Sequence, residues 1–124
     1  MLEKIDFSFK QKEDQTLRFT PSHIIYIVTF KYNNKTMDFD YQCNPKYGLP
    51  TKEECLNCVL SDAFGYEDSI DILDFAYRFG YNNTEYTRRV YKGCKEMSEK
   101  IHNMFTDEEI EILVNDIEMV DMDF

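Results

Sequence analysis

Four cysteines are the residues of this 124-residue chain whose type and spacing point most directly to chemistry. Cys55 and Cys58 form a Cys-x-x-Cys motif, the spacing of half a zinc ribbon and of a dithiol redox pair. A zinc shell would need further ligands, and the sequence offers Cys43, Cys94, His23 and His102. Because these stand singly, we interpret the cysteines as reduced thiols and expect no cofactor, with a metal site at Cys55 and Cys58 as the alternative.

The same motif bears on catalysis. Cys55 falls in the first turn of a predicted helix, where the positive helix end lowers the pKa of a thiol. A thioredoxin-like site, however, requires the motif to open a helix directly after a strand. The sequence also has no motif for binding phosphate or a dinucleotide and none for a hydrolase nucleophile. We therefore expect no catalytic residues and a protein that is not an enzyme.

Acidic residues are the second chemical feature. The formal net charge is −10, and residues 106–124 contain eight acids and no lysine or arginine. Such a field repels nucleic acid and attracts the basic groove of a protein partner, so we expect no direct nucleic-acid or membrane binding. A solvated helix face with a frayed acidic tail is the competing interpretation. The predicted partner-binding residues are Glu108, Glu111, Asp116, Glu118, Asp121 and Asp123.

A basic flank gives a different functional prediction. The residues concerned are Arg88, Arg89, Lys92, Lys95 and Lys100. Arg88, Lys92 and Lys95 share one helix face because they are four and seven residues apart. This flank could bind nucleic acid or an anionic partner. In a chain of this net charge we favour the interpretation that it pairs with acids of the second or fourth helix.

The elements that position these residues begin with strands. Residues 5–9 alternate apolar and polar side chains, and the alternation resumes at Leu17 and Phe19. Residues 23–32 are β-branched, aromatic and apolar on both faces at their start, which predicts a central strand. Residues 33–43 add a tight turn and a return strand, so the sequence predicts a β-hairpin.

Helical patterns follow the sheet. Thr51 and Glu54 form a capping box that opens the first helix, which we expect to end at Gly65. A second helix is predicted over residues 68–79, ending at Gly80.

A third helix is predicted to start at residues 83–84. Its expected inward residues are Tyr86, Val90, Cys94, Met97, Ile101 and Phe105. Gly93 lies within this stripe and suggests a close helix crossing, because glycine inside a helix otherwise costs about 1 kcal/mol. A fourth helix opens with a capping box of Thr106 and Glu109 and a hydrophobic staple between Phe105 and Ile110.

The predicted fold class is therefore α+β, a small antiparallel β-sheet with a β-hairpin core followed by about four short α-helices. We expect a single domain over 1–124, with sheet at 1–43, helices at 51–118 and a frayed tail at 119–124. The sequence has neither a run of about 18 apolar residues nor a signal-peptide pattern, so we expect a cytoplasmic protein.

The helical half also resembles small proteins of bacteriophages and prophages. The matching pieces are Pro50-Thr51, Val-Leu-Ser-Asp-Ala at 59–63, Phe-Ala-Tyr-Arg-Phe-Gly-Tyr at 75–81 and Tyr-Lys-Gly-Cys at 91–94. The resemblance covers roughly residues 23–105. The Asp-Ser that usually follows Phe-Gly-Tyr is Asn83-Thr84 here, and the acidic tail is not part of the pattern.

Small acidic phage proteins often inhibit host defence machinery, and anti-CRISPR proteins are the best-known class. The resemblance thus implies a phage-encoded inhibitor in the host cytoplasm that blocks a nucleic-acid-binding effector such as a Cas protein. The alternative function is a nucleic-acid-binding or regulatory phage accessory protein that uses Arg88, Arg89, Lys92 and Lys95.

Overall fold

The computed structural model of this protein describes residues 1–82 and 84–117. The predicted tail at 119–124 lies outside them. The predicted α+β class is confirmed, with a three-stranded sheet followed by four α-helices. In chain order the elements are η1 (Leu2–Lys4), β1 (Asp6–Gln11), β2 (Ile24–Tyr32), β3 (Lys35–Cys43), η2 (Pro45–Tyr47), α1 (Lys52–Glu67), α2 (Ile72–Phe79), α3 (Glu85–Met104) and α4 (Asp107–Ile117).

The sheet has the order β1-β2-β3 and is antiparallel throughout, so the apolar strand β2 is central as predicted. Asn33 and Asn34 join β2 to β3 with φ angles of 51° and 65°. Two successive positive φ angles match the twist of a hairpin, and asparagine adopts them at little cost. The predicted hairpin is confirmed.

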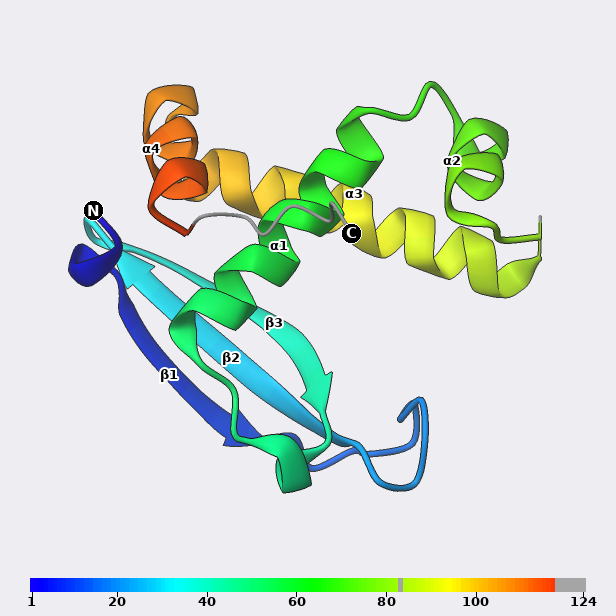
Figure 1. Cartoon of the computed structure of the whole chain (residues 1–124), viewed down its shortest axis with the longest axis horizontal. Coiled ribbons are helices and arrows are strands. Elements are labelled where there is room, and N and C mark those ends of the chain that lie inside the picture. The colour runs from blue at the N-terminus through cyan, green and yellow to red at the C-terminus, as the bar shows by residue number, and fades with distance from the viewer. Residues whose placement is uncertain (83, 118–124) are drawn as a thin grey trace.

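The two faces of the sheet differ in chemistry. Val28, Phe30 and Phe39 are buried on the face that meets the helices. The opposite face carries polar side chains, where the Thr29 hydroxyl donates to Asp38 Oδ1 at 2.6 Å. The helices therefore all pack on one side of the sheet (Figure 1).

The segment between β1 and β2 differs from the prediction. Leu17 and Phe19 were expected to continue a strand, but they lie in an exposed loop. Gln15 supplies the reason, because its amide takes the place of a strand residue beside β2. Gln15 Oε1 accepts from Ile25 N at 2.8 Å, and Gln15 Nε2 donates to Ile25 O at 2.9 Å.

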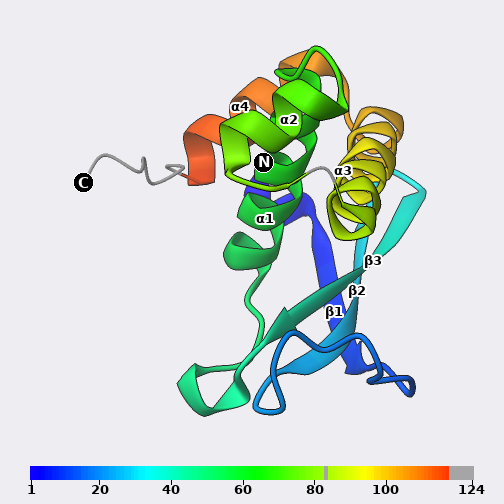
Figure 2. The ribbon, with the colours of Figure 1, turned by 90° about the vertical axis from the view of Figure 1, so that its right-hand side faces the viewer.

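The helices form a second layer. α1 crosses the sheet and packs against α3, while α2 and α4 lie at opposite ends of this layer (Figures 1 and 2). The apolar side chains of α1 that face the core include Leu56, Val59 and Leu60, which are fully buried. None of the helices formed by residues 1–82 and 84–117 combines the length and apolar composition needed to cross a membrane.

The first helix runs two residues beyond its predicted end. Gly65 is helical, and the ring of Phe79 packs over it, so that an added Cβ would lie 3.2 Å from Phe79 Cζ. The helix ends at Glu67 and is capped by Asp68, whose N–H donates to Phe64 O at 2.9 Å. The second helix then begins later than predicted, at the cap supplied by Asp71. Its predicted end at Gly80 is confirmed by a left-handed φ of 73°.

The buried face of α3 agrees with the predicted one at Cys94, Ile101 and Phe105 but differs from it in the first turn. Tyr86 is exposed, whereas Thr87 and Ser98 are buried together with Cys94 and Ile101. The buried hydroxyls have partners: Thr87 Oγ1 donates to Asn82 O, and Ser98 Oγ donates to Glu67 Oε1 at 2.8 Å. The apolar pattern omitted Thr87 and Ser98, because short polar side chains are buried only where such hydrogen-bond partners exist.

Gly93 is not at a close helix crossing. It is exposed, and an added Cβ would meet nothing within 4 Å. The glycine therefore costs helix stability without a packing reason that the described residues show.

We predict that Gly93→Ala raises the free energy of unfolding by about 0.5–1 kcal/mol, because alanine reduces the entropy of the unfolded chain at a site with open space. Thermal unfolding followed by circular dichroism measures the change. Gly65→Ala is the matched control and should gain less, because the Phe79 ring must move. Equal gains at the two sites would contradict the packing described for Gly65.

Candidate functional site

α4 carries the predicted acidic site and is fixed by its first turn. Glu109 N donates to Thr106 Oγ1 at 3.2 Å, and Thr106 N donates to Glu109 Oε1 at 2.9 Å, which is the predicted capping box. Phe105 and Ile110 are both buried, in agreement with the predicted staple. With Leu113 also buried, the opposite face of α4 must point to solvent.

Glu109 has a structural role beyond this cap. Its carboxylate accepts a hydrogen bond from the Tyr32 hydroxyl and so ties α4 to β2. The backbone hydrogen bond from Thr106, followed by the bond from Tyr32, lowers the pKa of Glu109. The bond to Glu109 in turn raises the pKa of Tyr32. Glu109 is thus committed to the fold and is not part of the free acidic face.

We predict that Tyr32→Phe lowers the melting temperature at pH 7 by a few degrees, because Glu109 loses a charge-assisted hydrogen bond. Glu109→Ala should lower it more, since it also removes the bond to Thr106 N. In the double variant the two losses should be less than additive, which calorimetry can measure. Strict additivity would show that the two side chains do not interact.

Three of the six predicted partner-binding acids lie within the described residues. Glu108 and Glu111 are exposed on α4, and neither forms an ion pair with any residue in 1–82 or 84–117. Asp116 is also exposed, with Oδ2 3.3 Å from the Met1 amino group. The other three, Glu118, Asp121 and Asp123, lie outside the described residues.

The basic flank is exposed along α3. Arg88, Arg89, Lys92 and Lys95 make no ion pair with the described residues, so the expected pairing with acids of α2 or α4 is not found there. The Arg89 guanidinium lies 5.9 Å from the centre of the Tyr86 ring. Lys100 is separate from these four, since its Nζ donates to Asp38 O at 2.7 Å.

The cysteines are free thiols with raised pKa values. Burial raises the pKa of Cys55, Cys58 and Cys94 to about 12, and burial also raises that of Cys43. The predicted lowering at Cys55 is therefore wrong. Cys55 has no exposed surface, so desolvation of the thiolate outweighs the helix end, and Glu54 adds to the rise.

The metal-site alternative gains no support. Over residues 1–82 and 84–117, no three His, Cys, Asp or Glu side chains gather as a metal site requires. His102 instead joins two helices to α3, with Nε2 2.5 Å from Glu67 Oε1 and Nδ1 3.4 Å from Asp107 Oδ1. These contacts give His102 a structural role.

Asp62 is a titratable group that the sequence patterns did not single out. It lies on α1, and burial raises the pKa of its carboxyl to about 6. Its one hydrogen-bond partner in the described chain is the Cys58 thiol, with Sγ 3.9 Å from Oδ2. An acid four residues after an inward-facing cysteine was the available signal, because residues so spaced share a helix face. The ionised form of Asp62 is thus poorly compensated.

We predict that Asp62→Asn stabilises the protein at pH 8 and not at pH 4. The folded pKa lies above the unfolded value, so the cost of ionisation is absent below about pH 4 and complete above about pH 6. The shift corresponds to about 1–3 kcal/mol. Unfolding by urea across this pH range measures the difference between variant and native protein. Asp68→Asn, at the exposed end of α1, is the control, and a difference independent of pH would contradict the assignment.

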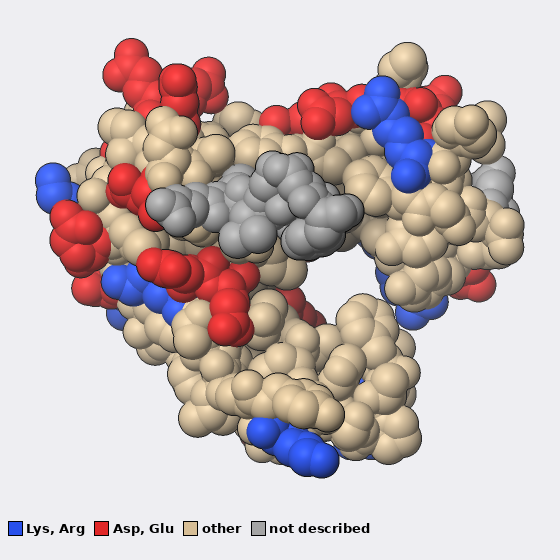
Figure 3. All heavy atoms as spheres, viewed as in Figure 1, with Lys and Arg blue, Asp and Glu red and all other residues tan. Residues whose placement is uncertain are grey.

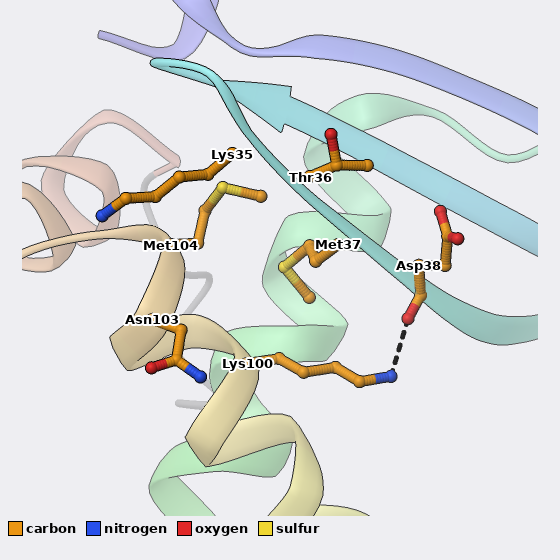
Figure 4. A pocket seen from close by; sticks show the side chains of 7 residues that line it. All are labelled: Lys35, Thr36, Met37, Asp38, Lys100, Asn103 and Met104. Carbon is orange, nitrogen blue, oxygen red and sulfur yellow. Dashed lines mark hydrogen bonds between the residues drawn. The ribbon is translucent and has the colours of Figure 1, made fainter.

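A hollow of about 630 Å³ separates the edge of β3 from α3 (Figure 4). Lys35 and Lys100 stand at this hollow, and the buried Met37 and Met104 form part of its lining. The bond from Lys100 to Asp38 O occupies a backbone acceptor at the sheet edge. The hollow contains none of the predicted acidic residues, and we assign it no ligand.

Comparisons of the chain with protein-family models, with curated proteins and with solved structures find no match.

Sequence patterns also missed an exposed apolar face on α2. Ile70, Leu73 and Tyr77 are exposed, while Phe75 and Ala76 on the other side of the helix are buried. The signal was available, because Leu73 and Tyr77 are four residues apart and therefore share one face of the predicted helix.

Proposed function

We propose that this protein acts by binding a basic protein partner through the outer face of α4 and thereby blocks a nucleic-acid-binding groove. The observation that carries the proposal is the free acidic face itself. Glu108 and Glu111 are exposed three residues apart, and the described residues supply neither with an ion-pair partner. Carboxylates held on a rigid helix complement a basic groove and steer its approach.

The charge distribution supports the same proposal. Figure 3 shows acidic side chains at the end of the molecule that carries α4. The apolar side chain of Ile112 is exposed on α4 next to Glu108 and Glu111 in the helical arrangement. A mixed apolar and acidic face offers a partner more than charge alone, because buried apolar contact supplies affinity while charge supplies rate and selectivity.

The resemblance to phage and prophage proteins extends the proposal to a biological role. In this extended proposal, the protein is phage-encoded and works in the host cytoplasm without catalysis. It inhibits a defence effector, with a nucleic-acid-binding Cas protein as the leading target. This part rests on the residues of the resemblance and not on the geometry of α4.

We predict that the double charge reversal Glu108→Lys and Glu111→Lys weakens partner capture at least tenfold. The measurement is affinity capture from a bacterial lysate at about 50 mM and about 500 mM salt, followed by mass spectrometry. The native protein should retain a basic nucleic-acid-binding protein at the lower salt only. It should then release DNA or RNA from that partner in a competition assay.

The matched control is the reversal of Glu96 and Glu99, which are likewise exposed and three residues apart, but on α3. It should leave capture within about twofold. If reversal on α3 weakens capture as much as reversal on α4, net charge and not the α4 face determines binding. If neither reversal matters, the acidic-face mechanism is wrong.

The basic flank supports a second candidate function, nucleic-acid binding. Four exposed cations lie along α3, and one of them, Arg89, lies against the exposed ring of Tyr86. Cations beside aromatic rings are the combination that holds single-stranded nucleic acid. A gel-shift assay at low salt with single- and double-stranded probes tests it. Retardation lost in Arg88→Ala with Lys92→Ala would support this function, and its absence in the native protein would remove it.

A further inference from the structure

The outer face of α2 is an apolar surface that the fold leaves uncovered in the described chain. Ile70 is 87% exposed, Leu73 59% and Tyr77 88%. On the inner side, Phe75 is buried and its ring packs against Tyr91 with centroids 5.3 Å apart. α2 is therefore apolar on both sides, and only one side contributes to the core. Contiguous exposed apolar groups of this kind mark interaction sites.

Local hydrogen bonds hold this face rigid. The Asp71 side chain accepts from Asp74 N at 2.9 Å, and Asp74 Oδ2 accepts from Ile70 N at 3.0 Å. Ile70 is thereby fixed to the first turn of α2 although it precedes the helix. At the other end, the N–H of Tyr81 donates to Ala76 O at 2.8 Å. A face ordered before binding loses less entropy when a partner docks.

The spacing of the three side chains indicates a helical partner. Leu73 and Tyr77 are four residues apart on α2, which places them along one ridge of the helix, and Ile70 is held against the first turn by its bond to Asp74. Such a ridge packs against the apolar stripe of a second helix, where side chains interdigitate. Tyrosine is also enriched among the residues that dominate binding energy.

The charge around the face determines which helix fits. Asp68 and Asp71 are exposed beside it, and Asp74 lies within the same turn. The one nearby cation on α2, Arg78, already lies 3.1 Å from Asp74 Oδ2. Acidic side chains also gather along the upper edge of Figure 3, over α1 and α2. In a symmetric pair of copies both sides of the interface would carry the same acidic residues, so a basic partner is favoured over a second copy.

We propose that the outer face of α2, formed by Ile70, Leu73 and Tyr77, docks a basic amphipathic helix of another protein. The leucine-type side chains of that helix cover the three apolar residues, and its lysines or arginines meet Asp68 and Asp71. This surface is separate from the acidic face of α4, and the proposal does not depend on that face.

The probe is a synthetic amphipathic peptide of roughly 14 residues built from leucine and lysine, compared with a leucine–glutamate peptide of the same pattern. Amide chemical shifts of the full-length protein report the contact surface, and calorimetry gives the affinity. The leucine–lysine peptide should shift residues 70–79 and bind, whereas the leucine–glutamate peptide should not. The double variant Leu73→Ser with Tyr77→Ser should weaken binding more than about tenfold.

The chain offers a closely matched control for that variant. Tyr47 and Leu49 are 82% and 58% exposed, in the loop before α1, so Tyr47→Ser with Leu49→Ser removes the same side-chain types with equal exposure. This control should leave the affinity within about twofold. The reversal of Glu108 and Glu111 should also leave it within about twofold, which separates this surface from that of the proposed function.

Four results would overturn the proposal. The first is a peptide footprint on α4 in place of α2. The second is an equal loss of affinity in the Tyr47 and Leu49 control. The third is sedimentation showing a dimer of the native protein that Leu73→Ser with Tyr77→Ser dissociates, which would assign the face to a second copy. The fourth is a chain ending at Ile117 that binds the peptide about tenfold more tightly, which would assign the face to residues 118–124.

Discussion

Burial of α1 between the sheet and α3 is the interaction on which the rest of the structure depends. Leu56 and Leu60 have no exposed surface, and the same cluster includes Val28 of β2 and Ile101 of α3. Truncating one such leucine costs about 2–5 kcal/mol, a large share of the total stability of a small domain. Strands and helices contribute to this one cluster. The sheet and the remaining helices therefore have no separate core on which to fold.

Because the core is built around α1, the outer helices α2 and α4 each keep one side exposed. α2 and α4 lie at opposite ends of the helical layer and each buries one side only (Figure 1). The side of α4 that remains is acidic, with Glu108 and Glu111, and the side of α2 that remains is apolar, with Leu73 and Tyr77. One small fold thus presents two surfaces of different chemistry, held in place by the same core.

Local patterns predicted the elements whose physics is local. The apolar faces of residues 23–32 identified a central strand, and the capping box of Thr106 and Glu109 marked the start of α4. Patterns failed where a distant residue decided the outcome. The first helix continues through Gly65, over which Phe79 packs, and Gln15 replaces strand pairing beside Ile25. The acidic face of α4 could be read from the charges in the sequence. Exposure of the outer face of α2 could not, because it depends on which side of that helix the rest of the chain covers.

The buried thiols allow local unfolding of the core to be measured. Cys55 of α1 and Cys94 of α3 are protonated at neutral pH and shielded from solvent, so the folded state reacts with thiol reagents slowly. Modification must wait until the two helices separate. The rate at which Cys55 and Cys94 are labelled therefore reports how often that part of the core opens, and no cysteine has to be introduced for the measurement. The unmodified chain carries its own sensor of local unfolding at the packing that unites its layers.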